Sequence, residues 1–332
     1  MREDVKKIEA ELQQPKDVVL ISHRNPDGDA IGSSLAIRFY LESKGHFVKA
    51  LLPSEYPENF GWLKGVEDFL IYDIEPDTCL KAIRDADLII GLDFNALDRI
   101  DKMGIAVEEN TRAFKMLMDH HIDPEPFADY YYCDDQASST CELVYQFIAE
   151  LGEEDAIKGS MAEAIYTGII TDTGSFHHAT NADLFQIVGK MKGRGLDDTT
   201  LQNNIFNNQT EKQMRLLGYC LNKRMTIDGE KGIGLIYLTR KDYEHFNIGR
   251  GDTEGIINYL LKVNVVKMAA LITAQPRIVK FSLRSKGDIS VQALARDHFN
   301  GGGHFNASGG YMHSSLGMAI NKFWEAAPDY IK

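Results

Sequence analysis

Short apolar runs alternate with segments of helical periodicity through the first half of the chain. The runs lie at residues 17–22, 47–52, 88–92 and 114–118. Runs of this length are typical of buried strands, whereas residues 30–44, with apolar positions three and four apart, are typical of a helix. Strands that alternate with helices need crossover connections. The pattern therefore predicts a mostly parallel sheet.

The rest of the chain continues this alternation and adds a second set of strands. Helices are predicted at residues 139–151, 161–170, 181–192 and 211–224, strands at 232–238, 266–273 and 277–285, and further helices around 253–261 and 289–296. We therefore predict an α/β fold in which a mostly parallel sheet domain at residues 1–195 precedes a smaller α/β domain at residues 225–332. Glycine-rich and polar segments mark residues 196–224 as a linker with a bridging helix.

Composition limits the functions that the protein can have. The chain has 332 residues and a net charge of −13, from 36 basic and 49 acidic residues, which argues against coating long nucleic acid. Four cysteines without a CxxC pair argue against a zinc ribbon or a disulfide framework, so we expect a reducing, cytoplasmic location. No run of eighteen apolar residues occurs, so we expect no membrane span.

Carboxylates and imidazoles gather after the predicted strands. They are His23, Asp27 and Asp29 after the first strand, Asp93 after the third, Asp119, His120 and His121 after the fourth, and Asp172 after the helix at 161–170. Each motif alone is more often a solvated turn, a helix cap or a packed pair. Together they favour divalent cations of the manganese type, because clustered buried carboxylates repel one another without a counter-charge.

The motifs that carry these residues resemble those of a known family. The segments HRNPDGDAIGS, the strand that ends at Asp93, MDHH and ITDTGSF occur in order and resemble the four motifs of the DHH phosphoesterase superfamily. The segment GGGHFNASGG resembles the signature of the C-terminal domain associated with that superfamily. The resemblance extends from about Asp17 to Met312.

The resemblance implies a site for two Mn²⁺ ions, with Mg²⁺ or Co²⁺ as substitutes, that hydrolyses phosphate esters. One ion would be held by His23, Asp27 and Asp93, and the other by Asp29, Asp93, His120 and Asp172. Asp93 would then bridge the ions. His121 would lie beside them and act on the substrate phosphate or in proton transfer, so Asp93 and His121 are the expected catalytic residues.

The second domain is expected to hold the substrate across an active-site cleft between the two domains. By the resemblance, the substrate contacts are Arg284, Ser285, Gly302, Gly303 and His304. From the residues alone, a glycine run can equally be a hairpin turn, although Arg284 can bind a phosphate through two hydrogen bonds. Asn300 and His177 depart from the family pattern, in which glycine and arginine are usual, and the effect of these departures is open.

Among the branches of the family, the chain resembles the bifunctional oligoribonucleases and phosphoadenosine-phosphate phosphatases. This implies hydrolysis of short oligoribonucleotides to mononucleotides and of 3′-phosphoadenosine 5′-phosphate to AMP, with no long nucleic acid and no membrane as partners. A phosphodiesterase for cyclic or linear dinucleotides is the alternative. A nucleotide sensor without turnover is a more remote one, since every expected ligand residue is intact. Substrate preference, cleavage polarity and formation of a homodimer are left open.

Overall fold

The chain forms two compact units, residues 1–208 and 209–332, in a computed structural model that describes residues 5–249 and 251–331. Residues 1 and 332, the outer limits of the predicted domains, lie outside the described residues. The predicted linker at 196–224 is divided between the units. Helix α8 (Asp198–Phe206) belongs to the first unit, because Leu201 is buried in its core, whereas α9 (Glu211–Tyr219) buries leucines in the second.

The first unit is built on a six-stranded sheet in which every neighbouring pair is parallel, in the order β3-β2-β1-β4-β5-β6. Its strands are β1 (Asp17–Ser22), β2 (Phe47–Leu52), β3 (Leu70–Ile71), β4 (Leu88–Leu92), β5 (Phe114–Asp119) and β6 (Tyr130–Cys133). The predicted parallel sheet is confirmed, and four of its strands coincide with the four apolar runs. Strand β3 has only two residues, too few to give a period of its own.

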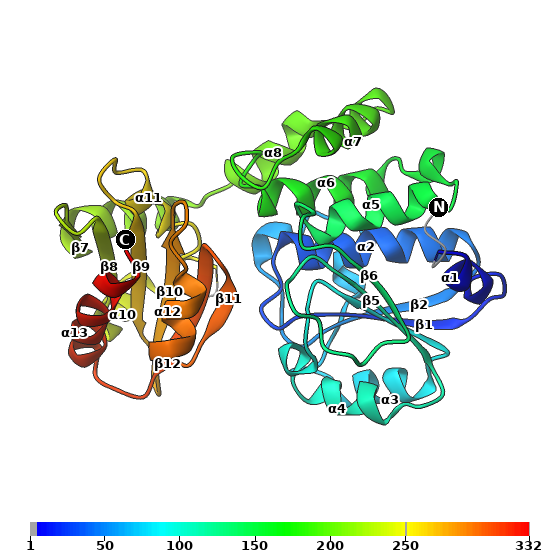
Figure 1. Cartoon of the computed structure of the whole chain (residues 1–332), viewed down its shortest axis with the longest axis horizontal. Helices are drawn as coiled ribbons and strands as arrows, with labels where there is room; N and C mark the ends of the chain where they lie inside the picture. Colours follow the sequence, from blue (N-terminus) through cyan, green and yellow to red (C-terminus); the bar gives the residue numbers. More distant parts are fainter. Residues whose placement is uncertain (1–4, 250, 332) are drawn as a thin grey trace. The chain divides into compact units, whose positions relative to one another are not determined.

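Helices cover both faces of this sheet (Figure 1). The helices of this unit are α1 (Val5–Glu11), α2 (Gly28–Ser43), α3 (Pro76–Asp85), α4 (Lys102–Glu109), α5 (Thr140–Glu150), α6 (Ser160–Asp172), α7 (Ala182–Gly193) and α8, of which α7 and α8 lie beyond α6. One core lies under α2, α5 and α6, and a second lies under α3 and α4. Successive side chains of β1 point to opposite faces of the sheet and so contribute to both cores. Val18 and Leu20 enter the first core, and Val19 and Ile21 enter the second.

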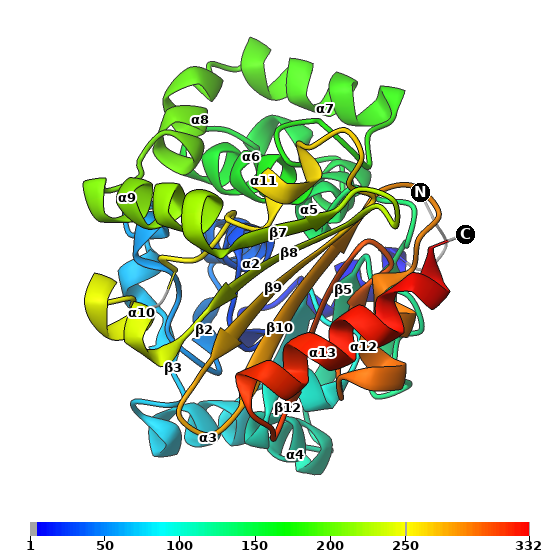
Figure 2. The ribbon, with the colours of Figure 1, turned by 90° about the vertical axis from the view of Figure 1, so that its left-hand side faces the viewer.

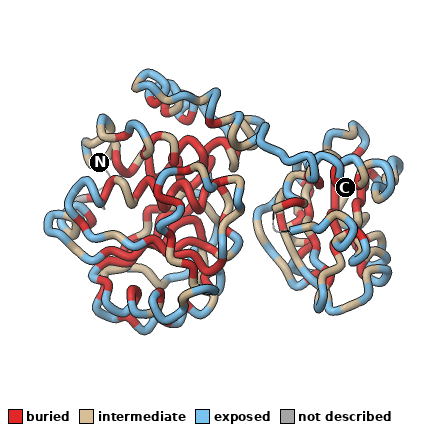
Figure 3. The backbone as a smooth tube through the Cα atoms, turned by 180° about the vertical axis from the view of Figure 1, so that it is seen from behind, coloured by how far each residue is buried: buried red, intermediate tan, exposed pale blue. Residues whose placement is uncertain are grey.

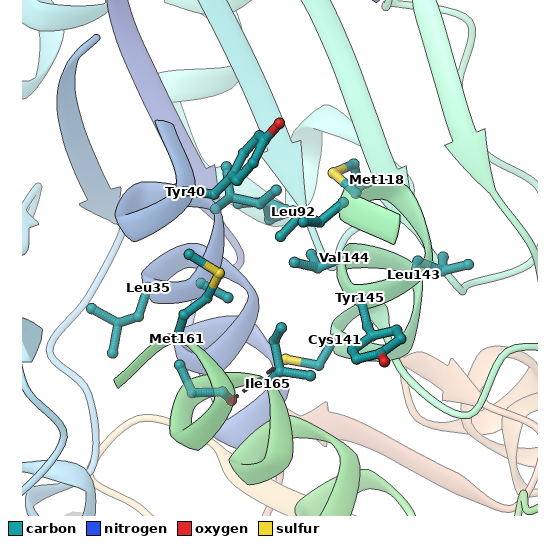
Figure 4. Close-up of a cluster of buried hydrophobic side chains, with 14 of the residues drawn as sticks. Leu35, Tyr40, Leu92, Met118, Cys141, Leu143, Val144, Tyr145, Met161 and Ile165 are labelled. Atoms are coloured by element: carbon teal, nitrogen blue, oxygen red, sulfur yellow. Dashed lines mark hydrogen bonds between the residues drawn. The ribbon is translucent and has the colours of Figure 1, made fainter. Parts of the chain in front are cut away.

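The first core is the larger of these two and consists of closely packed aliphatic, aromatic and sulfur-containing side chains. Figure 4 shows Leu35 of α2, Cys141 and Val144 of α5, and Ile165 of α6 together in it. All four side chains are fully buried. Buried residues form a continuous centre in the sheet and in the helices next to it (Figure 3). The residues that follow the strands are therefore held on a rigid frame.

The second unit has its own mixed sheet, in the order β11-β12-β10-β9-β8-β7 (Figure 2). Its strands are β7 (Met225–Asp228), β8 (Ile233–Leu238), β9 (Met268–Ala274), β10 (Val279–Ser285), β11 (Gly302–His304) and β12 (Ala307–Met312). Its helices are α9, α10 (Arg240–Phe246), α11 (Asn258–Leu261), α12 (Val291–His298) and α13 (Leu316–Ala326). The predicted helix at 253–261 is shorter than expected, because Gly255 has a φ of +75° and interrupts it.

Short helical turns complete the two units. They are the 3₁₀ turns η1 (Glu58–Phe60), η2 (Val66–Asp68), η3 (Leu97–Ile100), η4 (Glu154–Ala156) and η6 (Ala327–Tyr330), and the π-helical turn η5 (Cys220–Arg224). The predicted helix at 211–224 is thus an α-helix that ends in a π turn. Among the described helices, none combines the length and the apolar character needed to cross a bilayer.

Asp242 is a polar anchor of the second unit, and we expect its removal to destabilise the fold. Its carboxylate accepts hydrogen bonds from Arg224 Nη2 (2.7 Å), from the Tyr219 hydroxyl (2.7 Å), and from the Thr239 amide and hydroxyl (both 2.8 Å). Asp242→Ala should lower the free energy of unfolding by about 3 kcal/mol at pH 7 in a urea titration. Asp288→Ala, which removes an exposed carboxylate, should change it by less than about 0.5 kcal/mol.

The effect of Asp242 should depend on pH. Burial raises the pKa of this carboxyl, but hydrogen bonds from Arg224, Thr239 and Tyr219 outweigh it and lower the pKa to about 2. A carboxyl with a lowered pKa stabilises the fold above its unfolded value, near 4, and this contribution is lost as the pH falls towards 2. The difference between wild type and Asp242→Ala should therefore shrink below pH 4, and an equal difference at pH 3 and pH 7 would contradict this.

Candidate metal centre

The predicted metal ligands lie at the carboxyl edge of the parallel sheet, where its strand order reverses. Strand β1 lies between β2 and β4. The chain continues from β1 to β2 and from β4 to β5, which are opposite directions along the sheet. In a parallel sheet the loops beyond such a point diverge and leave a crevice. His23 directly follows β1 and Asp93 directly follows β4. The fold therefore brings the first and second motifs together.

His23, Asp27 and Asp93 form the first cluster, and their ligand atoms all lie within 4.8 Å of one another. His23 Nε2 is 3.3 Å from Asp93 Oδ2 and 3.9 Å from Asp27 Oδ1. Its Nδ1 lies 2.9 Å from the carbonyl oxygen of Arg24, which fixes the ring. This is the set that the resemblance implies for one ion.

Asp29, His120 and Asp172 form the second cluster, also within 4.8 Å. His120 Nε2 lies 3.1 Å from Asp172 Oδ2, 4.0 Å from Asp29 Oδ2 and 3.7 Å from Asp93 Oδ1. These residues come from α2, the loop after β5 and the last residue of α6. The structure therefore assembles the four residues expected around the other ion, with the two oxygens of Asp93 directed to different clusters.

Asp119, the last residue of β5, forms a third cluster with His121 and Asp93. It is fully buried, and its Oδ1 lies 2.7 Å from Nδ1 of His121. His121 Nδ1 is also 3.8 Å from Asp93 Oδ1, so the ring stands beside the two other clusters. The sequence placed Asp119 among the residues that follow the strands but gave it no role of its own. Its position directly before the two histidines was the only available signal.

Asp93 has a left-handed backbone, with a φ of +64°. This conformation is uncommon for a residue other than glycine, and asparagine and aspartate tolerate it best. The Asp93 amide donates to the carbonyl oxygen of Met118, the neighbouring residue of β5, at 3.0 Å. Backbone strain of this kind often occurs at functional sites, where a side chain is held in a fixed direction. Here the strained residue carries a buried carboxylate that lies near the imidazoles of His23, His120 and His121.

Asp29 is fixed by the first turn of α5, a contact that the sequence did not reveal. Its Oδ2 accepts from the Thr140 amide at 2.6 Å and its Oδ1 from the Cys141 amide at 2.9 Å. The Thr140 hydroxyl also donates to Asp93 Oδ1 at 3.1 Å. Amides at a helix N-terminus stabilise a negative charge. They favour the ionised form of Asp29, although its side chain is fully buried.

The pKa values show how much negative charge this site concentrates. Burial raises the pKa of Asp29 and Asp93 above the ordinary range, and neighbouring carboxylates raise that of Asp93 further. Burial, together with the charges of Asp29 and Asp27, raises the pKa of Asp172 to about 6. Burial lowers the pKa of His120, but its bond to Asp172 and the nearby carboxylates raise it well above the usual value. A divalent cation relieves this repulsion, so the donor set fits one.

Arg24 fixes the first motif from outside the clusters. Its guanidinium binds both oxygens of Asp73, at 2.7 and 2.9 Å, and also bonds Asp101. Its amide donates to the carbonyl oxygen of Arg99 at 2.9 Å. Asp101 itself has a φ of +51°. The loop that carries His23 is thus tied to two neighbouring loops.

We expect Arg24→Met to weaken binding of Mn²⁺ about tenfold while the fold is kept, since the loss of groups that orient ligands typically costs ten- to a hundredfold. Calorimetric titration of metal-free protein with Mn²⁺ measures this. Arg38→Met is the matched control, because Arg38 bonds two carboxylates, Glu42 and Asp68, outside the clusters. Equal affinity in Arg24→Met and wild type would show that the loop keeps its shape without Arg24.

The substrate residues expected in the second unit lie on neighbouring strands. Arg284 of β10 and His304 of β11 both pair with Ala307 of β12, so they lie on the same face of the sheet. Gly303 has a φ of +138°, and a Cβ there would meet the carbonyl oxygen of Ala307 at 2.7 Å. A Cβ at Gly302 would meet no atom within 4 Å. Gly303 is therefore required by the hairpin, whereas Gly302 is not.

Ser285 has a structural role in the second unit. Its hydroxyl is buried, donates to the carbonyl oxygen of Ile289 at 2.6 Å and accepts from Asn306 Nδ2 at 2.8 Å. A substrate contact through this hydroxyl would have to break that network, and the Ser285 amide already donates to the carbonyl oxygen of Asn306 at 3.0 Å, so we do not propose Ser285 as a substrate contact. Asn300 has a left-handed φ of +47°, which explains why asparagine can replace glycine there. His177 is exposed, on the loop after α6.

Comparisons with known proteins identify the family of each of the two units. Residues 17–169 match the N-terminal domain of the DHH family, and residues 232–332 match the DHHA1 domain. The chain is 26% identical over 311 residues to the probable bifunctional oligoribonuclease and PAP phosphatase NrnA of Streptococcus mutans, which covers 93% of this chain and 94% of that protein. It is 25% identical over 301 residues to the Bacillus subtilis NrnA, covering 90% of each.

A solved structure gives a higher identity. The crystal structure of an exopolyphosphatase-related protein from Bacteroides fragilis is 35% identical, has a TM-score of 0.95, and covers 99% of this chain and 97% of that one. Family matches in both units and this relative agree with the predicted order of the two domains. The chain therefore belongs to the DHH family, with an N-terminal DHH domain followed by a DHHA1 domain.

Proposed function

We propose that this protein is a metal-dependent phosphoesterase that degrades short oligoribonucleotides to mononucleotides and converts 3′-phosphoadenosine 5′-phosphate to AMP. In both reactions water attacks phosphorus, a P–O ester bond breaks, and the leaving oxygen takes up a proton. The observation that carries the proposal is the meeting of the six expected ligand residues, from four separate motifs, in two clusters that the two oxygens of Asp93 connect. The relatives named oligoribonuclease and PAP phosphatase support the choice of substrates.

We further propose that the site holds two Mn²⁺ ions, on His23, Asp27 and Asp93 and on Asp29, Asp93, His120 and Asp172. Bound ions of this type lower the pKa of water and neutralise charge on phosphoryl oxygens. The protein's own groups position the reaction. Asp119 holds the His121 ring through Nδ1, and we assign His121 to contact with the phosphate or to proton transfer.

The distribution of charge supports a substrate held by the second unit. Residues 1–208 contain 19 Lys and Arg against 38 Asp and Glu, whereas residues 209–332 contain 17 against 11. The second unit is therefore basic, although the whole chain has a net charge of −13. A basic surface attracts phosphates, and a short substrate needs only a few such contacts. We assign the substrate contacts to Arg284, Gly302, Gly303 and His304 in this unit.

A dinucleotide phosphodiesterase is the second candidate. The cyclic-di-AMP phosphodiesterase GdpP of Geobacillus thermodenitrificans is 26% identical over 335 residues, which cover 97% of this chain but only 48% of that protein. This chain therefore spans about half the length of that protein. We rank this activity second because the two NrnA relatives are matched over 94% and 90% of their length.

A parallel assay separates the candidates. Purified protein with Mn²⁺ is offered RNA of two to five nucleotides, DNA of the same lengths, phosphoadenosine phosphate and cyclic di-AMP, and the products are resolved by chromatography over time. We expect mononucleotides from RNA and AMP plus phosphate from phosphoadenosine phosphate. Efficient hydrolysis of cyclic di-AMP with no attack on RNA would replace the first candidate by the second.

A further inference from the structure

In the second unit, helices α12 and α13 pack on one face of the sheet, over β10 and its neighbouring strands. Side chains alternate along β10, so Val279, Phe281 and Leu283 enter the core under α12 and α13, while Lys280, Ser282 and Arg284 point to the opposite face. We call this opposite face, over β10, β12 and β11, the outer sheet face. Its paired residues are Lys280 with Tyr311, Ser282 with Gly309, Arg284 with Ala307, Gly302 with Gly309, and His304 with Ala307.

Different side chains lie at the two ends of the outer sheet face. Arg284 and His304, the proposed contacts for the end of the substrate, lie at one end. Lys280 and Tyr311 lie directly opposite each other at the other end, four residues along β10. Lys280 is exposed and makes no ion pair with any described residue, and Tyr311 is 41% exposed. An unpaired cation beside an exposed aromatic ring is a suitable surface for a phosphate and its base.

Between these ends the outer sheet face carries only the small side chain of Ser282 and two glycines, Gly302 and Gly309, whose lack of a side chain is not required by packing. A Cβ at Gly302 would meet no atom within 4 Å, and a Cβ at Gly309 would meet only the carbonyl oxygen of Phe281, at an ordinary 3.6 Å. By contrast, a Cβ at Gly301 or Gly310 would collide with backbone at 1.9 or 2.6 Å. The absence of side chains at Gly302 and Gly309 therefore leaves room for a nucleic-acid strand to approach the backbone of the sheet.

Spacing argues against a single phosphate that uses both cations. Four residues of strand span about 13 Å at 3.3 Å per residue, and side chains stand roughly perpendicular to a sheet. A cation bonds a phosphate oxygen at about 2.8 Å. Lys280 and Arg284 therefore serve different phosphates of one chain.

We propose that the outer sheet face at Lys280 and Tyr311 is a second nucleotide subsite, which binds the part of a single-stranded oligoribonucleotide beyond the nucleotide held at Arg284. The subsite rests on the proposed function. Lys280 pairs with a phosphate, the Tyr311 ring stacks on a base, and Gly302 and Gly309 leave room for the strand between them. A mononucleotide such as phosphoadenosine phosphate does not extend to this subsite, so the subsite favours longer substrates.

The test compares chain lengths in Lys280→Ala and Tyr311→Ala. We expect the ratio of kcat/KM for a five-nucleotide RNA to that for phosphoadenosine phosphate to fall about tenfold in each variant, in line with the loss of one phosphate contact or one stacked base. Lys322→Ala, which removes an exposed lysine of α13, should leave the ratio unchanged. An unchanged ratio in Lys280→Ala and Tyr311→Ala, or a fall in Lys322→Ala of the same size, would overturn the subsite.

A binding measurement separates this inference from the proposed function. Fluorescence anisotropy of a labelled five-nucleotide RNA is measured with the Asp93→Asn protein, with and without Lys280→Ala. We expect about tenfold weaker binding with Lys280→Ala and a salt dependence that is lower by about one charge. Equal affinity overturns the subsite even if wild type hydrolyses RNA. Weaker binding supports it even if wild type prefers cyclic di-AMP, in which case only the proposed function fails.

Discussion

Asp93→Asn is expected to lower kcat on a short RNA roughly 10³-fold, the largest loss of activity for any single residue of this protein. The reason is its position. Asp93 Oδ2 lies 3.3 Å from His23 Nε2, while Oδ1 lies 3.7 Å from His120 Nε2 and 3.8 Å from His121 Nδ1. An amide in its place keeps the shape but loses the charge that both clusters share. Steady-state kinetics with Mn²⁺ at several concentrations measure the effect.

The same substitution should leave the fold intact. Asparagine tolerates the left-handed φ of +64° as well as aspartate does. Burial raises the pKa of Asp93, and the neighbouring carboxylates raise it further, so ionising this carboxyl works against the metal-free fold. A group with a raised pKa stabilises the fold below its unfolded value and loses this contribution as the pH rises. Metal-free Asp93→Asn should therefore melt at or above the temperature of metal-free wild type at pH 7.

Added Mn²⁺ separates the loss of metal from the loss of fold. It should raise the melting temperature of wild type, because a ligand that binds only the folded state stabilises it, and should raise that of Asp93→Asn much less. Asp87→Asn is the matched control, since Asp87 is an exposed carboxylate just before the other end of β4. It should behave as wild type in both assays. Activity within tenfold of wild type in Asp93→Asn would refute the bridging role.

Local patterns were sufficient to predict the frame of the site. The apolar runs at β1 and β4 are short and β-branched, and a parallel sheet brings their carboxyl ends to one edge, so His23 and Asp93 could be placed together from the sequence alone. The ligand sets came from the resemblance, and the structure assembles the same residues. The role of each ligand remains a proposal.

Contacts between distant segments could not be predicted. The amides that hold Asp29 belong to Thr140 and Cys141, more than a hundred residues later, and no local pattern connects them. The glycine run shows the same limit. The sequence does not distinguish Gly301 from Gly302. In the structure, a Cβ at Gly301 would collide with the backbone of Gly309, whereas a Cβ at Gly302 would meet no atom within 4 Å. Such differences depend on what lies across the sheet.

Gly168→Ala is expected to destabilise the first unit by about 3 kcal/mol, at the upper end of the usual cost of overpacking a core. Helices α2 and α6 approach closely at glycines on both sides. A Cβ at Gly168 would lie 2.2 Å from Cys141 Sγ and 2.5 Å from Asp29 Oδ1, and a Cβ at Gly32 would lie 2.4 Å from the carbonyl oxygen of Ala164. Cys141 is itself enclosed among buried side chains of α2, α5 and α6 (Figure 4). The added methyl therefore has no space unless Asp29 or Cys141 moves.

Because Asp29 is one of the groups that must move, Gly168→Ala should also weaken Mn²⁺ binding, which links the packing of α2 against α6 to the site. Urea unfolding and calorimetric titration of the same sample measure both effects. Gly189→Ala is the matched control, since Gly189 is an exposed glycine inside α7 with no atom within 4 Å of the added methyl, and it should stabilise the fold by about 0.5–1 kcal/mol. Adding Cys141→Ala to Gly168→Ala should recover part of the lost stability, because it removes the closest contact. If the two glycine variants were equally stable, the close approach of the helices would not require Gly168.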